Sequence, residues 1–134
     1  MIPQDYVEDI FLRLEIYNDI SNAKNDYDID HIVSKLEDIY GPIPDYLNNL
    51  FSLTRVKIEG SRIKVVKIKI NKENTIITLN SKSLIDNNKL INHFVLKSKI
   101  KLTNQFNLKY QNISKDNFSE LCGEVISMIK DISD

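Results

Sequence analysis

The spacing of the apolar residues changes once along the chain, near Gly60, and this change limits the possible folds more than any other feature. Before Gly60, apolar residues recur every three to four positions, as they do on one face of a helix. After it, the stretch "KVVKIKI" alternates apolar residues with lysines, which is typical of a strand with one buried face. Helices and strands are therefore segregated along the chain rather than alternating, which favours the α+β class.

The first amphipathic segment predicts a helix over about 6–24. Asp5 is its expected N-cap, and Glu8, three residues later, is the expected capping-box partner. Six apolar residues recur at helical spacing and form the expected buried stripe: Val7, Ile10, Phe11, Leu14, Tyr17 and Ile20.

The second amphipathic segment predicts a helix that ends abruptly at the stretch "YGP". Gly41 supplies the left-handed position after the helix, and the proline that follows it prevents continuation. Asp26 or Asp28 could cap the start of this helix. Pro44 suits the first turn of a third helix, which is expected to end near Gly60.

The second half of the chain predicts a small antiparallel sheet and a closing helix. "KVVKIKI" and "NTIITLN", joined by the turn-like "NKEN", predict a central β-hairpin. A short helix is expected after Asp86 and a further strand at about 106–110. Ser114 is the expected cap of a C-terminal amphipathic helix whose apolar stripe is Phe118, Leu121, Cys122, Val125, Ile129 and Ile132. We expect residues 1–134 to form a single domain.

Charge is distributed unevenly along the chain. Residues 1–50 contain 11 acidic and 3 basic residues, whereas residues 51–115 contain 3 acidic and 14 basic residues. The acidic residues are either a solvated helix face or a docking surface for a basic partner. The basic residues are either the solvated lysines of a lysine-rich chain or contacts to nucleic-acid phosphates. The lysines concerned are Lys64, Lys67, Lys69 and Lys72 on the hairpin, with Lys97, Lys99 and Lys101 further on.

Motifs of enzymes are missing from the sequence. It contains no P-loop, no glycine-rich nucleotide loop, and no HExxH, CxxC or GxSxG motif. We therefore expect a chain with no active site, cofactor or metal of its own. No apolar run is long enough for a membrane span, the N-terminus has no signal-peptide pattern, and Cys122 has no cysteine partner, so we expect a cytoplasmic protein without membrane contact.

Two stretches of the sequence resemble the C-terminal (TRCF) domain of bacterial transcription-repair coupling factor, or Mfd. "KLEDIYGPIPDYLNNLFSLTRVK" resembles the segment Glu-Leu-x-Asp-Arg-Phe-Gly-x-x-Pro and the helix after it. "IPQDYVEDIFLRLEIYNDISNAK" resembles the opening Ile-Pro-x-x-Tyr-Val-x-Asp-x-x-x-Arg-Leu-x-x-Tyr-x-x-Ile-x-x-Ala, with matches at Ile2, Pro3, Tyr6, Val7, Asp9, Arg13, Leu14, Tyr17, Ile20 and Ala23. A hairpin follows at the expected distance, and beyond about residue 80 only the pattern of elements matches.

This resemblance implies a regulatory role inside a larger protein. Proteins of the family are ATP-dependent DNA translocases that remove RNA polymerase stalled at DNA lesions and recruit UvrA for nucleotide-excision repair. Their motor domains, which use ATP and Mg, lie upstream of the segment seen here, so we expect this chain to be excised from a longer one. The resemblance also implies autoinhibition, because the domain docks on the UvrB-like module of its own chain and masks the UvrA-binding surface.

The resemblance further implies which residues dock. The family uses the acidic pair of Glu-Leu-x-Asp-Arg-Phe-Gly; Asp38 matches the Asp, and Lys35 stands at the Glu position. Tyr40 stands at the Phe position, and Glu37 lies about 100° round the helix from Asp38. The expected protein-docking residues are therefore Lys35, Glu37, Asp38 and Tyr40. The alternative function is a nucleic-acid-binding module that uses the basic hairpin.

Overall fold

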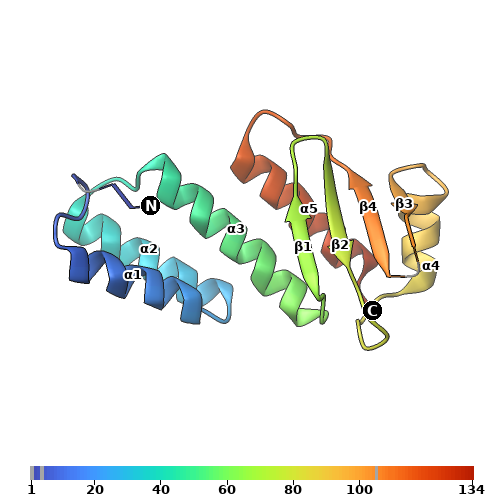
Figure 1. The fold of residues 1–134 in the computed structure, drawn as a ribbon, viewed down its shortest axis with the longest axis horizontal. Helices are drawn as coiled ribbons and strands as arrows, with labels where there is room; N and C mark the ends of the chain where they lie inside the picture. Colours follow the sequence, from blue (N-terminus) through green and yellow to red (C-terminus); the bar gives the residue numbers. More distant parts are fainter. Residues whose placement is uncertain (1, 4, 105) are drawn as a thin grey trace. The chain divides into compact units, whose positions relative to one another are not determined.

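The computed structural model describes residues 2–3, 5–104 and 106–134. These residues form five α-helices, one short π-helix and a four-stranded antiparallel sheet (Figure 1). This arrangement confirms the predicted α+β class, with helices at both ends of the chain and the sheet between them. Backbone contacts divide the chain into an N-terminal unit, Met1–Ile58, and a C-terminal unit, Glu59–Asp134. That residues 1–134 form a single domain stays a prediction.

Three helices start in the N-terminal unit: α1 (Ile10–Asn22), α2 (Asp26–Tyr40) and α3 (Asp45–Arg62). Helix α1 begins later than predicted, because Asp9 rather than Asp5 is its N-cap and accepts the N–H of Phe11 at 2.8 Å. The residues before it instead form a turn, in which the N–H groups of Tyr6 and Val7 donate to the carbonyl of Pro3.

Helix α2 starts and ends at residues with clear local chemistry. Its N-cap is Asn25, whose side chain accepts the N–H of Asp28 at 2.8 Å, so the predicted caps Asp26 and Asp28 instead lie inside the first turn. Helix α2 ends at Tyr40, as predicted. Gly41 has φ = +86°, a backbone conformation that only glycine adopts readily, and its N–H donates to the carbonyl of Glu37 at 3.0 Å.

The core of the N-terminal unit uses only part of the predicted stripe, because Val7 and Ile20 are buried and Tyr17 packs against the core. Ile16 and Ile20 of α1 are buried. Ile10, Phe11 and Leu14 are 55%, 77% and 57% exposed. Because α1 carries apolar residues on more than one side, its spacing alone does not show which side packs. The core residues are Ile2, Val7, Ile16, Ile20, Ile29, Leu36, Leu47 and Phe51.

The C-terminal unit is a sheet in the order β1-β2-β4-β3, with every neighbouring pair antiparallel. The hairpin of β1 (Lys67–Ile70) and β2 (Asn74–Thr78) confirms the predicted one, and β4 (Asn107–Gln111) lies where a third strand was expected. Strand β3 (Ile100–Leu102) was not predicted.

Helices cover one face of this sheet. The short helices α4 (Asn87–Leu90) and η1 (Ile91–Val95) precede β3, and α5 (Phe118–Ile132) closes the chain. Figure 1 shows α5 passing behind the sheet. The sheet residues buried on that side are Thr75, Ile77, Ile100, Leu108 and Tyr110, and those of α5 are Leu121, Cys122, Val125, Met128, Ile129 and Ile132. No described element of the C-terminal unit covers the opposite face of the sheet, here called the open face.

The N-cap of α5 differs from the predicted Ser114. Asn117 caps the helix and accepts the N–H of Glu120 at 3.0 Å. Ser114 lies before the helix, and its own N–H donates to the carboxylate of Glu124 at 2.7 Å. Serine and asparagine are both favoured at N-cap positions, and Asn117 is the one that directly precedes the first helical residue, Phe118.

Candidate docking site on helices α1 and α2

The segment before α1 is fastened to the helix pair by residues that match the family pattern. Ile2 and Val7 are buried in the core. The guanidinium of Arg13 donates to the carbonyls of Val7 at 2.6 Å and Glu8 at 2.9 Å, and the hydroxyl of Tyr17 accepts the N–H of Ile2. These contacts fix the N-terminal end of α1 against the segment that precedes it, residues 2–3 and 5–9, which we call the leading segment.

The same leading segment holds the C-terminal end of α2. The hydroxyl of Tyr6 donates to the carbonyl of Gly41 at 3.0 Å, and its ring packs on Tyr40 with 5.6 Å between ring centroids. Burial, and then the nearby carboxylate of Glu37, raise the pKa of Tyr6, so its hydroxyl stays a neutral donor. The last turn of α2, which carries the predicted docking residues, is therefore held in a fixed position.

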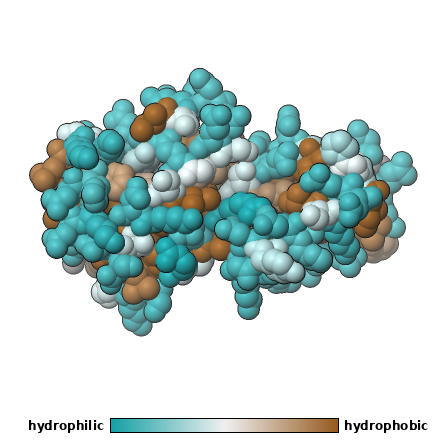
Figure 2. Space-filling model, turned by 180° about the vertical axis from the view of Figure 1, so that it is seen from behind, coloured by the Kyte–Doolittle hydropathy of each residue, from teal (hydrophilic) through white to brown (hydrophobic). Residues whose placement is uncertain are grey.

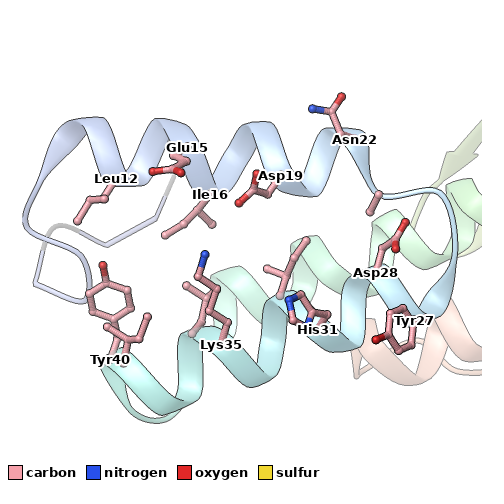
Figure 3. A pocket seen from close by; sticks show the side chains of 14 residues that line it. Leu12, Glu15, Ile16, Asp19, Asn22, Tyr27, Asp28, His31, Lys35 and Tyr40 are labelled. Carbon is pink, nitrogen blue, oxygen red and sulfur yellow. The ribbon is translucent and has the colours of Figure 1, made fainter.

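A groove runs between α1 and α2. It encloses about 450 Å³, and Figure 3 shows side chains of both helices pointing into it. Its surface is mixed, because exposed apolar side chains stand beside charged ones. Its lining residues include Leu12, Ile16 and Asp19 from α1 and His31, Lys35, Ile39 and Tyr40 from α2.

The four predicted docking residues divide between this groove and its surroundings. Lys35 and Tyr40 line the groove, with Tyr40 half-buried at one end of it. Asp38 is exposed beside the groove, about 60° round α2 from Lys35, and makes no ion pair with any described residue. Glu37 lies on the opposite flank of α2, near Tyr6. A common role for these four residues in docking stays a prediction.

An exposed apolar patch of α1, outside the groove lining, was missed from the sequence. The exposed side chains of Ile10, Phe11 and Leu14 lie in the first turns of α1. Leu12 of the same turns lines the groove at the end where Tyr40 lies (Figure 3). On the face of the molecule in Figure 2, apolar residues form separate patches in a mostly hydrophilic surface. The apolar spacing of α1 was visible in the sequence, but it does not distinguish a docking patch from a core stripe.

The predicted nucleic-acid contacts are not all on one surface. Lys67 and Lys69 lie on the open face of the sheet. Lys64 lies in the turn between α3 and β1 with φ = 61°, and Lys72 lies in the turn between β1 and β2. Lys97 is in the turn after η1. Lys99 and Lys101, which were predicted, lie on the open face together with Lys109, which was missed because the register of β2 with β4 was not foreseen.

Within residues 2–3, 5–104 and 106–134, no three His, Cys, Asp or Glu side chains are grouped so that they could hold a metal ion. No helix in the same ranges combines the length and the apolar character that a membrane crossing needs.

Sequence and structure comparisons agree on one family. The sequence model of the TRCF domain matches residues 1–90. Similar proteins are the transcription-repair-coupling factors of Myxococcus xanthus (30% identity over 67% of this chain) and of Buchnera aphidicola (30% over 75%). The chain spans only 8% and 12% of their lengths. A crystal structure of the C-terminal domain of transcription-repair coupling factor shares the fold, with a TM-score of 0.73 and 20% identity over 96% of this chain and 86% of that one. The chain belongs to the TRCF domain family of transcription-repair coupling factors.

Proposed function

We propose that this chain is the regulatory docking domain of a transcription-repair coupling factor. In this proposal the parent protein is an ATP-dependent DNA translocase that removes stalled RNA polymerase and recruits UvrA, and ATP and Mg are used only by its motor domains. The domain docks on the UvrB-like module of the same chain and masks the surface that UvrA would bind. Polymerase engagement releases the dock and so exposes that surface.

The observation that supports this proposal best is the position of Asp38. Its carboxylate is exposed on the last turns of α2, without an ion-pair partner among the described residues, on a helix end that Tyr6 holds in place. A carboxylate held in this way can select a basic partner surface without a large cost in ordering. Phe11 and Leu14, which are exposed on α1 outside the groove lining, would supply the apolar anchor that a purely charged contact lacks.

Tethering makes a weak contact sufficient. The docking domain and its module belong to one chain in this proposal, so the effective concentration of one for the other reaches the millimolar range for a short flexible connection. A coupling free energy of about 1–3 kcal/mol between docking and UvrA binding would then change UvrA affinity about 5- to 150-fold. Lys35 carries a positive charge where the family has an acid, so the dock is weaker than one with two acids. The coupling free energy is therefore expected near the lower end of this range.

The experiment is a UvrA-binding assay on the full-length protein without polymerase. Asp38→Lys and Leu14→Ser are each expected to raise UvrA affinity about 5-fold or more, because each removes part of the dock. Lys35→Glu is expected to lower UvrA affinity, because it restores the acidic pair. These opposite directions separate a docking effect from general destabilisation.

Glu8→Lys is the matched control. Glu8 is also an exposed acid of the N-terminal unit, and only its backbone carbonyl is used, by Arg13. Its reversal makes the same change in net charge and is expected to leave UvrA affinity within about 2-fold, as for a surface change of under 0.5 kcal/mol. Equal UvrA affinity for the wild type, Asp38→Lys and Leu14→Ser would refute the docking role of this surface.

A further inference from the structure

The open face of the sheet in the C-terminal unit carries a cluster of lysines that the sequence did not show as one surface. Pairing of the strands places Lys69 opposite Ile76, Ile76 opposite Lys109, and Lys109 opposite Lys101. These residues form one row across all four strands. Lys67 lies in a second row on the same face, and Lys99 continues β3, because its carbonyl accepts the N–H of Gln111.

All five lysines of this open face (Lys67, Lys69, Lys99, Lys101 and Lys109) are exposed, and none has an ion-pair partner among the described residues. The strands add only neutral side chains beside them. Glu73, in the turn after β1, lines a hollow beside these lysines and is itself paired with Lys115 at 2.7 Å. The positive charge of this face is therefore not neutralised within the described part of the unit.

One contact on this face is unfavourable by itself. Lys101 and Lys109 are directly opposite on neighbouring strands, and like charges in that position destabilise a sheet. A repulsion that nothing else in the fold offsets is expected at functional sites, where a bound ligand of opposite charge can offset it. The hollow, of about 230 Å³, lies at this pair, and its lining also includes the amides of Asn74 and Gln111, which can donate to anionic oxygens. The lining includes one acid, Glu73, whose carboxylate is paired with Lys115.

We propose that this open lysine face binds the phosphate backbone of duplex DNA without reading its sequence. Across the strands, Lys101 and Lys109 are about 5 Å apart and Lys109 and Lys69, with Ile76 between them, about 10 Å apart, while lysines two residues apart along a strand are about 7 Å apart. Several can therefore meet the phosphates of one duplex face. A protein partner fits less well, because protein interfaces are depleted in lysine and need apolar anchors, and the only large apolar side chain within these rows is the half-buried Ile76. The rows contain no aromatic side chain on which unpaired bases could stack, which disfavours single strands. This proposal is independent of the docking role of α1 and α2.

The test is fluorescence anisotropy of a labelled duplex of about 25 base pairs and arbitrary sequence, titrated with the 134-residue chain at several salt concentrations. If three to five lysines neutralise phosphates, raising the salt from about 50 to about 200 mM lowers the affinity roughly 40- to 500-fold. The variant with Lys67, Lys69, Lys101 and Lys109 all changed to Gln is expected to lose at least about 10-fold in affinity at the lower salt and most of the salt dependence. The same four changed to Arg are expected to retain binding.

A matched control removes four lysines elsewhere. Lys24, Lys57, Lys82 and Lys130 are equally exposed and lie off the open face, so their change to Gln makes the same change in net charge. This control is expected to keep duplex affinity within about 3-fold of the wild type, and circular dichroism verifies that both Gln variants are folded. Equal losses in the two variants, or no binding by the wild type at about 50 mM salt, would overturn the proposal. Displacement of the duplex by an equal charge of polyglutamate would also overturn it, in favour of an acidic protein segment.

Discussion

A buried amide in the C-terminal unit allows a stability prediction whose size follows from its contacts. Asn112 is 2% exposed, and its Nδ2 donates to the carbonyls of Asn71 at 2.7 Å and Lys72 at 3.1 Å in the turn between β1 and β2. Its Oδ1 accepts the hydroxyl of Thr75 at 2.9 Å, and Thr75 is fully buried. The side chain thus ties the end of β4 to the hairpin turn with three hydrogen bonds.

Asn112→Ala removes all three bonds at once. Each is worth about 1 kcal/mol net, and the buried hydroxyl of Thr75 is left without its acceptor, so we expect a loss of about 3–4 kcal/mol in the free energy of unfolding. With a urea m-value of about 2 kcal/mol/M, the unfolding midpoint falls by roughly 1.5–2 M. Urea titration followed by circular dichroism measures this, with Gln111→Ala as the control. Gln111 is the preceding, exposed residue of β4, and its truncation is expected to cost under about 0.5 kcal/mol.

A double-mutant cycle tests the reasoning more directly. Thr75→Val removes the hydroxyl and keeps the shape of the side chain, so its combination with Asn112→Ala should cost about 1 kcal/mol less than the sum of the two single changes. An Asn112→Ala variant that loses less than about 1 kcal/mol, or a cycle without coupling, would refute the assignment of this amide as the tie between β4 and the turn.

Two further predictions concern titrating groups of the same unit. Burial raises the pKa of Cys122 to about 11, so its thiol should not react with iodoacetamide at pH 8 in the native chain and should react after unfolding; equal rates in the two states would contradict the burial. Burial alone would raise the pKa of Glu124, but hydrogen bonds from the Tyr110 hydroxyl and from the N–H groups of Ile113 and Ser114 lower it overall. Burial, and then the carboxylate of Glu124, raise the pKa of Tyr110. The contribution of Glu124 to the free energy of unfolding is therefore present above its unfolded pKa of 4.5 and is lost as the pH falls through its lower folded pKa. The contribution of Tyr110 is present below its unfolded pKa of 10.0 and is lost as the pH rises above that value. Urea midpoints between pH 3 and 7 should fall less steeply toward low pH for Glu124→Gln than for the wild type, and parallel curves would contradict this.

Local chemistry made part of the fold predictable. The end of α2 could be located from Gly41, because few residues tolerate a positive φ, and the hairpin followed from strict alternation. Strand β3 escaped prediction because it has only three residues and depends on its pairing with β4 for support. The N-caps of α1 and α5 were misplaced because several residues with good capping chemistry stand close together, and tertiary contacts decide among them.

The candidate surfaces were harder to predict than the elements that carry them. Lys67 and Lys69 were recognisable from alternation within one strand, but Lys109 joins them only through the register of β2 with β4. Similarly, the exposed side chains of Phe11 and Leu14 cannot be told from core residues until the packing of α1 is known. In both cases the missing information is non-local, because it depends on pairing between segments that are distant in the sequence.

The positions that identify the family differ in what they do in the structure, and this affects how far function can be transferred. Within the opening motif, Asp9 caps α1, Arg13 and Tyr17 bind the leading segment, and the others apart from Leu14 are buried, half-buried or bonded within the N-terminal unit. Such residues are required by the fold, so a match at these positions supports the family and says little about a partner. Leu14 is exposed, as is Asp38 from the second matched segment, and neither side chain is needed by the described contacts of the unit. The proposed docking would therefore depend mainly on these two residues among the matched ones, which is why their substitution tests the proposed function more stringently than substitution of any other matched residue.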